Sequence, residues 1–365
     1  MKSVRTKLKL NNQQKTLFAQ HAGYVRWCYN WGLSLWNAAY RDGYKPNAHK
    51  LRKVFTNHTK PLYPWMKNLS SRVYQYAFLN LGEAFKRFFQ GLGKYPKFKK
   101  KGRHDSFTID NGGRPIELNG WSHKLPFIGI VKTYEPIEAT TQKITISRQA
   151  GDWYLSCSFE LTPETTPKTT EPKTTEVVGV DLGIKTLATL SSGVVFESLK
   201  SYRCFEAKLS RLQYLNRNKV IGSANWQKAQ LKIARLYRRV ANIRKDKLHK
   251  LTTYLAKNHG TVVIEDLNVS GMLANHKLAK SIADQGFYEF RRQLKYKCEW
   301  YGCNLVVVDR FFPSSKTCSN CGHIQDMPLN LRTYDCMKCG LSIDRDLNAS
   351  INLRNAVGST VNACG

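Results

Sequence analysis

The sequence predicts a multidomain α+β protein in which a polar segment separates two folded regions. Residues 162–176 contain almost no apolar side chain and have proline at every fourth or fifth position, which is typical of a linker. Before this segment the pattern changes from helical spacing to short β segments, and after it apolar strands alternate with helices. We therefore expect a first region of helices and antiparallel strands and a second region with an α/β layer structure.

The first region begins with residues 1–10, which alternate as a short strand does. In residues 11–103 apolar side chains recur at helical spacing, so we expect a helical insertion there. Residues 104–161 contain short β segments, such as 143–147 and 153–159, separated by Gly and Pro. This pattern indicates a small β barrel or sandwich.

The second region begins with an apolar strand, residues 177–181, which ends in a carboxylate and has a hairpin partner at 186–190. One apolar stripe then runs from Ala229 to Leu255 and predicts a long helix. A second apolar strand, residues 261–265, also ends in an acid, and a further helix precedes a strand at 305–308.

The charge of the chain indicates a polyanionic partner. The 58 Lys and Arg residues outnumber the 26 Asp and Glu residues and leave a net charge of +32, which would repel itself on an unpartnered surface. Nucleic acid is the partner that this surplus favours. A basic protein that binds membranes is the alternative, but no amphipathic anchor stands out.

One basic loop has aromatic rings interleaved with its charges, as backbone contact with nucleic acid would require. Such contacts carry no sequence specificity by themselves. A solvated surface loop is the alternative. The six cations of this ten-residue loop are Lys94, Lys97, Lys99, Lys100, Lys101 and Arg103.

The N-terminus lacks the apolar stretch of a signal peptide, and no run reaches the eighteen apolar residues that would cross a bilayer. We therefore expect a cytoplasmic protein with no membrane partner. In that reducing compartment the ten cysteines are expected as thiols or metal ligands, not disulfides.

Four cysteines have the spacing of a zinc site. Cys318-x-x-Cys321-Gly and Cys336-x-x-Cys339-Gly are separated by fourteen residues, and four thiolates can close a tetrahedral site. Each following glycine permits the tight turn that a backbone makes around sulfur. With no vacant position, this zinc is expected to be structural. The other six cysteines are interpreted as buried or incidental.

Three acids are the candidate catalytic residues. A carboxylate at the end of a buried strand is costly unless a cation or a donor meets it, and Asp181 and Glu265 both have this position. Either acid alone would be explained equally well as an ion-paired or capping residue. Asp346 stands where the N-cap of a helix is expected, and capping would explain it as well as catalysis would.

The combination of these motifs is specific. The segments that carry it are Val-Gly-Val-Asp181-Leu-Gly-Ile-Lys, Val-Ile-Glu265-Asp-Leu-Asn-Val-Ser-Gly-Met, Pro-Ser-Ser-Lys-Thr-Cys318-Ser-Asn-Cys-Gly and Asp-Arg-Asp346-Leu-Asn-Ala. They resemble the TnpB (OrfB transposase) family of transposon-encoded RNA-guided nucleases, which is taken as ancestral to type V CRISPR effectors. The resemblance covers nearly the whole chain.

The resemblance implies a wedge β-barrel domain with a helical recognition insertion, followed by an RNase H-like (RuvC) α/β nuclease domain with an inserted zinc ribbon. The expected boundaries are 1–10 and 104–161 for the wedge, 11–103 for the recognition insertion, 162–176 for the linker, 177–312 and 344–365 for the nuclease domain, and 313–343 for the ribbon.

The resemblance also implies an endonuclease that cuts guide-matched DNA beside a short transposon-adjacent motif. Its partners would be a transposon-derived guide RNA and double-stranded target DNA, with a monomer on the RNA. Asp181, Glu265 and Asp346 would hold Mg²⁺, as a pair of ions, and Arg332 would reach a phosphate near the site. Surface placement on the ribbon is the alternative for Arg332. Asp266 is a poor substitute for Glu265, because neighbours on a strand point to opposite faces.

Asp344 is the stronger rival to Asp346, which is chosen because it directly precedes Leu-Asn-Ala as in the family.

Two other functions remain as alternatives, a nuclease-silent RNA-guided repressor and a transposase or its accessory protein. A repressor would be free to lose its acids, whereas this chain has all three. A tyrosine transposase would need a His-hydrophobe-His motif, which does not occur among the nine histidines. Strand-transferring relatives of RNase H read Asp, Asp, Glu along the chain, whereas the order here is Asp, Glu, Asp.

Overall fold

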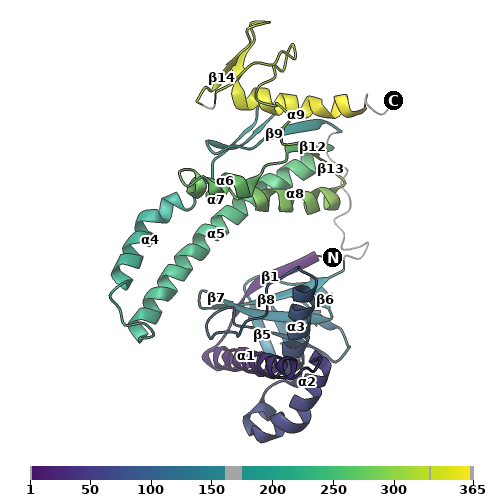
Figure 1. The fold of residues 1–365 in the computed structure, drawn as a ribbon, viewed down its shortest axis with the longest axis vertical. Coiled ribbons are helices and arrows are strands. Elements are labelled where there is room, and N and C mark those ends of the chain that lie inside the picture. The colour runs from purple at the N-terminus through teal and green to yellow at the C-terminus, as the bar shows by residue number, and fades with distance from the viewer. Residues whose placement is uncertain (1, 161–174, 329, 362–365) are drawn as a thin grey trace. The chain divides into compact units, whose positions relative to one another are not determined.

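The computed structural model describes residues 2–160, 175–328 and 330–361. They form two compact units, Met1–Thr162 and Pro163–Gly365 (Figure 1). The predicted linker, 162–176, lies outside the described residues except for its last two positions. In the part of the chain that is described, no helix combines the length and the apolar character needed to span a bilayer.

The first unit contains a six-stranded sheet in the order β2-β7-β8-β1-β5-β4 and a two-stranded sheet of β3 and β6. The N-terminal strand β1 joins the later strands because it pairs antiparallel with β8 along one edge and with β5 along the other. The predicted β segments are confirmed. The bounds are β1 Lys2–Lys9, β2 Ser106–Asp110, β3 Ile116–Leu118, β4 Ser122–Leu125, β5 Gly129–Thr133, β6 Ala139–Thr141, β7 Lys143–Gln149 and β8 Asp152–Phe159.

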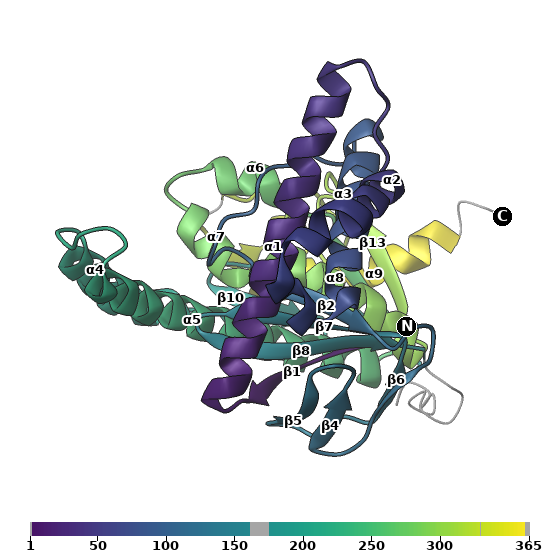
Figure 2. The same ribbon diagram turned by 90° about the horizontal axis from the view of Figure 1, so that it is seen from below.

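Helices cover this sheet (Figure 2). Aromatic side chains from the helices and from strands β2 and β8 pack together in the core of the unit. The first helix starts at a capping box in which Asn11 and Gln14 exchange side-chain and backbone hydrogen bonds. Trp36 stacks on Phe85 with ring centroids 4.0 Å apart and so fixes the first helix against the third. The bounds are α1 Asn12–Arg41, α2 Ala48–Val54, η1 Phe55–Thr59, η2 Lys60–Leu62, η3 Pro64–Asn68 and α3 Ser71–Phe89.

The second unit is built on a five-stranded sheet in the order β11-β10-β9-β12-β13. Strand β12 is parallel to both β9 and β13, whereas β10 runs antiparallel to β9 and β11. The central strands are buried on both faces, which is why they read as continuous apolar runs in the sequence. The bounds are β9 Val177–Asp181, β10 Thr186–Leu190, β11 Val195–Glu197, β12 Thr261–Glu265 and β13 Asn304–Val308.

Helix α9 covers one face of this sheet, and α5 and α8 cover the other (Figure 1). The predicted apolar stripe is confirmed as part of the 35-residue helix α5, which Ser223 caps. The sequence pattern did not predict β11, α4, α6 and α7. The bounds are α4 Arg203–Asn216, α5 Ala224–Asn258, α6 Val269–Ala274, α7 Ala279–Gln285, α8 Phe287–Tyr301 and α9 Arg345–Val361, with β14 Thr333–Asp335 and β15 Ser342–Asp344 forming a short hairpin.

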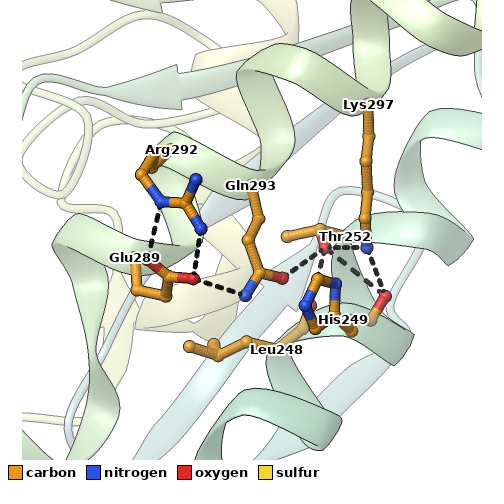
Figure 3. Close-up of polar contacts among 7 residues, drawn as sticks. All are labelled: Leu248, His249, Thr252, Glu289, Arg292, Gln293 and Lys297. Carbon is orange, nitrogen blue, oxygen red and sulfur yellow. Dashed lines mark hydrogen bonds and ion pairs between the residues drawn. The ribbon is translucent and has the colours of Figure 1, made fainter. Parts of the chain in front are cut away.

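A polar cluster joins α5 to α8 (Figure 3). The buried Lys297 ammonium donates to the His249 carbonyl oxygen and to the hydroxyls of Thr252 and Thr253, each at 2.7 Å. Burial lowers the pKa of Lys297 to about 8. Gln293 accepts from Thr252 and donates to Glu289, so the cluster continues to the surface. Because three donors meet three acceptors, the cluster fixes the register of the two helices.

The close approach of α9 to β9 depends on Gly179. A Cβ atom at this position would lie 1.9 Å from the Ser350 carbonyl oxygen and 2.5 Å from the Arg354 amide nitrogen. Both atoms belong to the backbone of α9, so they cannot rotate away as a side chain would. Glycine is therefore required for the helix to touch the strand at this point.

We predict that Gly179→Ala lowers the free energy of unfolding of the second unit by about 3 kcal/mol, at the upper end of overpacking effects, because α9 must move. Thermal and denaturant melts measure this change. Gly23→Ala is the matched control, since its Cβ would meet only Arg26 at 3.7 Å and alanine favours the α1 helix. Equal melting temperatures for Gly179→Ala and the unaltered protein would contradict the prediction.

Candidate acidic site and metal centre

The two strand-end acids lie side by side. The parallel pairing of β12 with β9 matches Ile264 to Val180, and Glu265 and Asp181 are the next residue on each strand. Matched residues on parallel neighbours point to the same face of a sheet, so both carboxylates are presented together at one edge. Both side chains are partly buried.

The third acid comes from the first turn of α9. Capping, the alternative explanation for Asp346, is excluded by the hydrogen bonds at the start of this helix. The Asp344 carboxylate accepts from the backbone N–H groups of Asp346 and Leu347 at 2.9 and 3.1 Å, so Asp344 is the cap. Asp346 is thereby released from capping, and its carboxylate accepts instead from the Thr186 hydroxyl at 3.3 Å, which places it beside β10.

The electrostatics indicate that these acids share one space. Burial raises the pKa of Asp181 to about 7, and the charges of Asp346 and then Glu265 add to this effect. Burial, with the neighbouring charge of Asp266, also raises the pKa of Glu265. A buried carboxyl whose ionisation two neighbouring carboxylates oppose belongs to a site that a cation would stabilise, and hard oxygen ligands suit Mg²⁺.

Asp266 belongs to a different contact network. Its carboxylate accepts from Arg291 and, at 2.6 Å, from Arg310. These two hydrogen bonds, that from Arg291 first, lower the pKa of Asp266. Asp266 is thus an ion-paired acid. Among the residues that the structure describes, no hydrogen bond or cation offsets the causes that raise the pKa of Glu265 beside it.

Arg332 lies at the same acidic site. Its guanidinium is 3.9 Å from the Asp346 carboxylate, and its carbonyl oxygen accepts from the Arg345 amide at 2.8 Å. The side chain remains half exposed. Arg332 is therefore close enough to Asp346 to interact with a negative charge at this site, and its side chain is still accessible from solvent.

The four predicted cysteines form a metal-sized cluster. Their sulfur atoms all lie within 4.8 Å of one another, and the Cys318–Cys339 and Cys321–Cys336 pairs are both 3.6 Å apart. A tetrahedron with zinc–sulfur bonds of about 2.3 Å has edges of about 3.8 Å, so the donor set fits zinc. In the described ranges, no other group of three or more His, Cys, Asp or Glu side chains gathers closely enough to hold an ion. The three acids, which repel one another, do not converge to that degree.

The backbone of the two knuckles repeats the same turn. Gly322 and Gly340 both have φ of +72°, as expected for residues that follow the second cysteine of each pair. Their N–H groups donate to the carbonyl oxygens of Cys318 and Cys336 at 2.9 and 3.0 Å. Of the other cysteines that the structure describes, Cys204 is exposed and the rest are buried.

Two asparagines of α9, which the sequence analysis did not single out, fasten the first knuckle to this helix. Asn348 accepts from the Ser319 amide at 2.9 Å and donates to the Thr317 carbonyl at 2.7 Å. Asn352 donates to the carbonyls of Ser314 and Thr317 at 2.7 and 2.6 Å. In the sequence, the spacing of four residues places both asparagines on one face of the expected helix, which could have indicated that this face makes polar contacts. The same helix therefore carries Asp346 and holds the cysteine cluster.

The basic loop belongs to the first unit and is only partly free. Lys94, Lys97, Lys100, Lys101 and Arg103 are exposed. Lys99 differs, because its backbone exchanges hydrogen bonds with Asn30 and its ammonium lies 4.2 Å from the ring centroid of Tyr29. Burial lowers the pKa of Lys99. Lys99 thus anchors the loop to α1 while five other cations face solvent.

Known proteins of one family are similar to this chain over most of its length. A family model described as "Probable transposase" matches residues 158–276, and a "Cas12f1-like, TNB domain" model matches residues 287–353. A Streptomyces pristinaespiralis protein named "Putative RNA-guided DNA endonuclease" is 41% identical in an alignment of 320 positions that covers 82% of this chain and 75% of that protein. The chain belongs to the TnpB (OrfB transposase) family. A relative from Escherichia coli K12 is named "Putative RNA-guided DNA endonuclease InsQ". It is 34% identical, and the alignment covers 100% of this chain and 94% of the relative.

The fold agrees with this TnpB membership. A Cas12f1 chain solved by cryo-EM in a complex with sgRNA and target DNA superposes with a TM-score of 0.57 at 15% identity, covering 94% of this chain and 83% of that chain. The chain therefore has a TnpB/Cas12-like multidomain α+β fold. A model described as "Helix-turn-helix domain" matches residues 1–45, but in the structure that range contains strand β1 and the single 30-residue helix α1.

We predict one zinc ion per chain, bound by the four cysteines, and loss of that zinc in Cys318→Ser and Cys339→Ser. Elemental analysis of the purified protein measures the zinc, and thermal melts should show a lower transition for both variants, because metal binding contributes to folding of such small units. Cys204→Ser is the control, since Cys204 is exposed and lies outside the cluster. Fully folded protein without zinc would contradict the assignment.

We also predict that Asp181→Asn raises the melting temperature at pH 8 without magnesium and with zinc retained. Above a pKa of about 7 the folded protein must ionise a carboxyl that an unfolded chain ionises freely above about 3.9, and each pKa unit corresponds to about 1.4 kcal/mol. The gain should shrink as the pH falls from 8 to 5, because the folded wild-type carboxyl then becomes protonated. A gain that grows toward pH 5 would contradict the raised pKa.

Proposed function

We propose that this chain is an RNA-guided DNA endonuclease that hydrolyses guide-matched DNA with a site formed by Asp181, Glu265 and Asp346. The observation that carries the proposal is the presentation of two strand-end acids and one helical acid around the same edge of a sheet. A five-stranded sheet with its second strand antiparallel and acids on its first and fourth strands is the arrangement expected of an RNase H-like nuclease. The names of the relatives from Streptomyces and Escherichia support the same activity.

The domain organisation is proposed accordingly. Two halves of the RuvC-like domain, 177–312 and 344–365, enclose a zinc ribbon at 313–343. The wedge, residues 1–10 and 104–161, surrounds the helical recognition insertion, 11–103. The pairing of β1 with β8 and β5 supports the division of the wedge, because it joins the two segments in one sheet.

Two magnesium ions bound to the three acids would activate a water molecule and stabilise charge on the leaving oxygen. The chain's own residues position these ligands. Strand pairing fixes Asp181 beside Glu265, and the Thr186 hydroxyl orients Asp346. Asp344 holds the first turn of α9 in place as its cap. Arg332 is suited to stabilise negative charge on a phosphate near Asp346.

Guide RNA and target DNA are the proposed partners, with base pairing supplying specificity and the protein holding the heteroduplex by its backbone. The net charge of +32 supports this role. In the basic loop, the five exposed cations are suited to phosphate contact, and Lys99 keeps the loop in position. A nuclease-silent repressor is less well supported, because it would retain a destabilising cluster of acids without using it.

We predict that Asp181→Ala, Glu265→Ala and Asp346→Ala each abolish magnesium-dependent cleavage of a plasmid that carries the guide-matched target. RNA and target binding should remain near the wild-type level, because binding is distributed over many Lys and Arg contacts. Cleavage is read on gels, and binding by mobility shift with the RNA that co-purifies with the protein.

Asp344→Asn is the matched control for Asp346. Asparagine caps a helix about as well as aspartate does, so this change removes a charge beside the site and keeps α9 intact. It should retain cleavage. If Asp344→Asn eliminated cutting while Asp346→Ala cut normally, the third ligand would be misassigned. If the unaltered protein with its own RNA never cut, the endonuclease proposal itself would fail.

A further inference from the structure

A pocket of about 500 Å³ opens directly beside Glu265 in the second unit. Its floor is apolar and comes from elements that are far apart in sequence, with Leu182 after β9, Ile264 on β12 and Phe287 at the start of α8. Leu273 of the short helix α6 forms part of its wall and is 40% exposed. An accessible apolar concavity beside an acidic metal site has no evident role in holding the metal.

The rim of the pocket carries two arginines. Arg291 and Arg310 both line it and both donate to the Asp266 carboxylate. A guanidinium has five N–H donors, so Asp266 orients each arginine without using all of its donors. The two arginines carry one positive charge more than Asp266, and Glu265 is the acid among the residues that line the pocket. Tyr288, also at the rim, is 72% exposed and offers a ring face.

These features match one nucleotide. A nucleobase binds against apolar or aromatic side chains such as those of this pocket, and the phosphate next to it binds a positively charged group. The pocket borders Glu265, so a nucleotide bound there would be within a residue or two of the phosphate being cut.

We propose, resting on the endonuclease function above, that this pocket binds one unstacked nucleotide of the DNA strand being cut. The base enters against Leu273 and Tyr288, and the adjoining phosphate contacts Arg291 and Arg310. A base in a duplex is stacked and paired, so it cannot enter without an energetic cost. The pocket therefore selects single-stranded DNA at the site and fixes the strand's position relative to the acids.

The test compares two substitutions of equal charge on one short helix. Leu273→Glu places a carboxylate in the pocket wall, whereas Ala274→Glu places one on the next residue, which is exposed and does not line the pocket. We expect Leu273→Glu to reduce the cleavage rate about tenfold relative to Ala274→Glu, within the range for losing one base contact. Guide-matched binding should be the same in both variants.

Abasic substitutions in the target strand provide the second measurement. For the unaltered protein, removing the base at one position near the scissile phosphate should slow cleavage about tenfold, and removal at its neighbours should have less effect. In Leu273→Glu the same abasic position should cause no further loss, because the contact is already absent. A 2-aminopurine at that position should change its fluorescence on binding to the cleavage-inactive Asp181→Ala protein, but not when Leu273→Glu is also present.

The outcomes separate the two proposals. If the unaltered protein cuts, but Leu273→Glu matches Ala274→Glu and no abasic position stands out, the nucleotide pocket is excluded and the endonuclease function stands. If an abasic position stands out equally in Leu273→Glu and in the unaltered protein, the base binds elsewhere. If the unaltered protein does not cut guide-matched DNA under any of these conditions, the endonuclease function fails first.

Discussion

Contact between α9 and β9 at Gly179 is the constraint on which the arrangement of the site depends. The helix backbone occupies the space in which any other residue would carry its Cβ atom. Gly179 is two residues before Asp181, and Ser350, which it touches, is one helical turn after Asp346. The closest point of contact therefore brings Asp181 and Asp346 together, although these two acids are 165 residues apart in the sequence (346 − 181).

The same helix also links the acids to the cysteine cluster. Asn348 and Asn352 hold the backbone of the first knuckle, and Asp346 lies half a turn before Asn348. Arg332 reaches Asp346 from the segment between the two cysteine pairs, next to β14. A zinc ion that rigidifies the knuckles would thus also restrain α9. This explains in physical terms why a metal with no vacant coordination position can matter for a site that it does not touch.

The sequence was sufficient for the elements and ligands that depend on local pattern. Continuous apolar runs predicted β9 and β12, and cysteine spacing predicted a cluster whose sulfur geometry fits zinc. The family motif selected Asp346 over Asp344, whereas the residues alone left capping and catalysis equally open for Asp346, because two acids this close to a helix start cannot be ranked by pattern. Their roles depend on which carboxylate meets the free N–H groups. Lys99 was grouped with five exposed lysines and arginines for the same reason, since only tertiary contact with Tyr29 and Asn30 distinguishes it.

The pocket beside Glu265 was beyond reach of sequence patterns, because its walls come from three separated segments and its rim depends on Asp266. In the sequence, Asp266 is only an inferior neighbour of the strand-end acid. In the structure the two adjacent carboxylates, at the last residue of β12 and just after it, have opposite electrostatic environments. Burial, and then the charge of Asp266, raise the pKa of Glu265, whereas hydrogen bonds from Arg291 and Arg310 lower the pKa of Asp266. One dipeptide thereby contributes to the acidic site proposed to hold Mg²⁺ and to the arginine rim proposed to contact phosphate, and binding a DNA strand at a metal centre would require both.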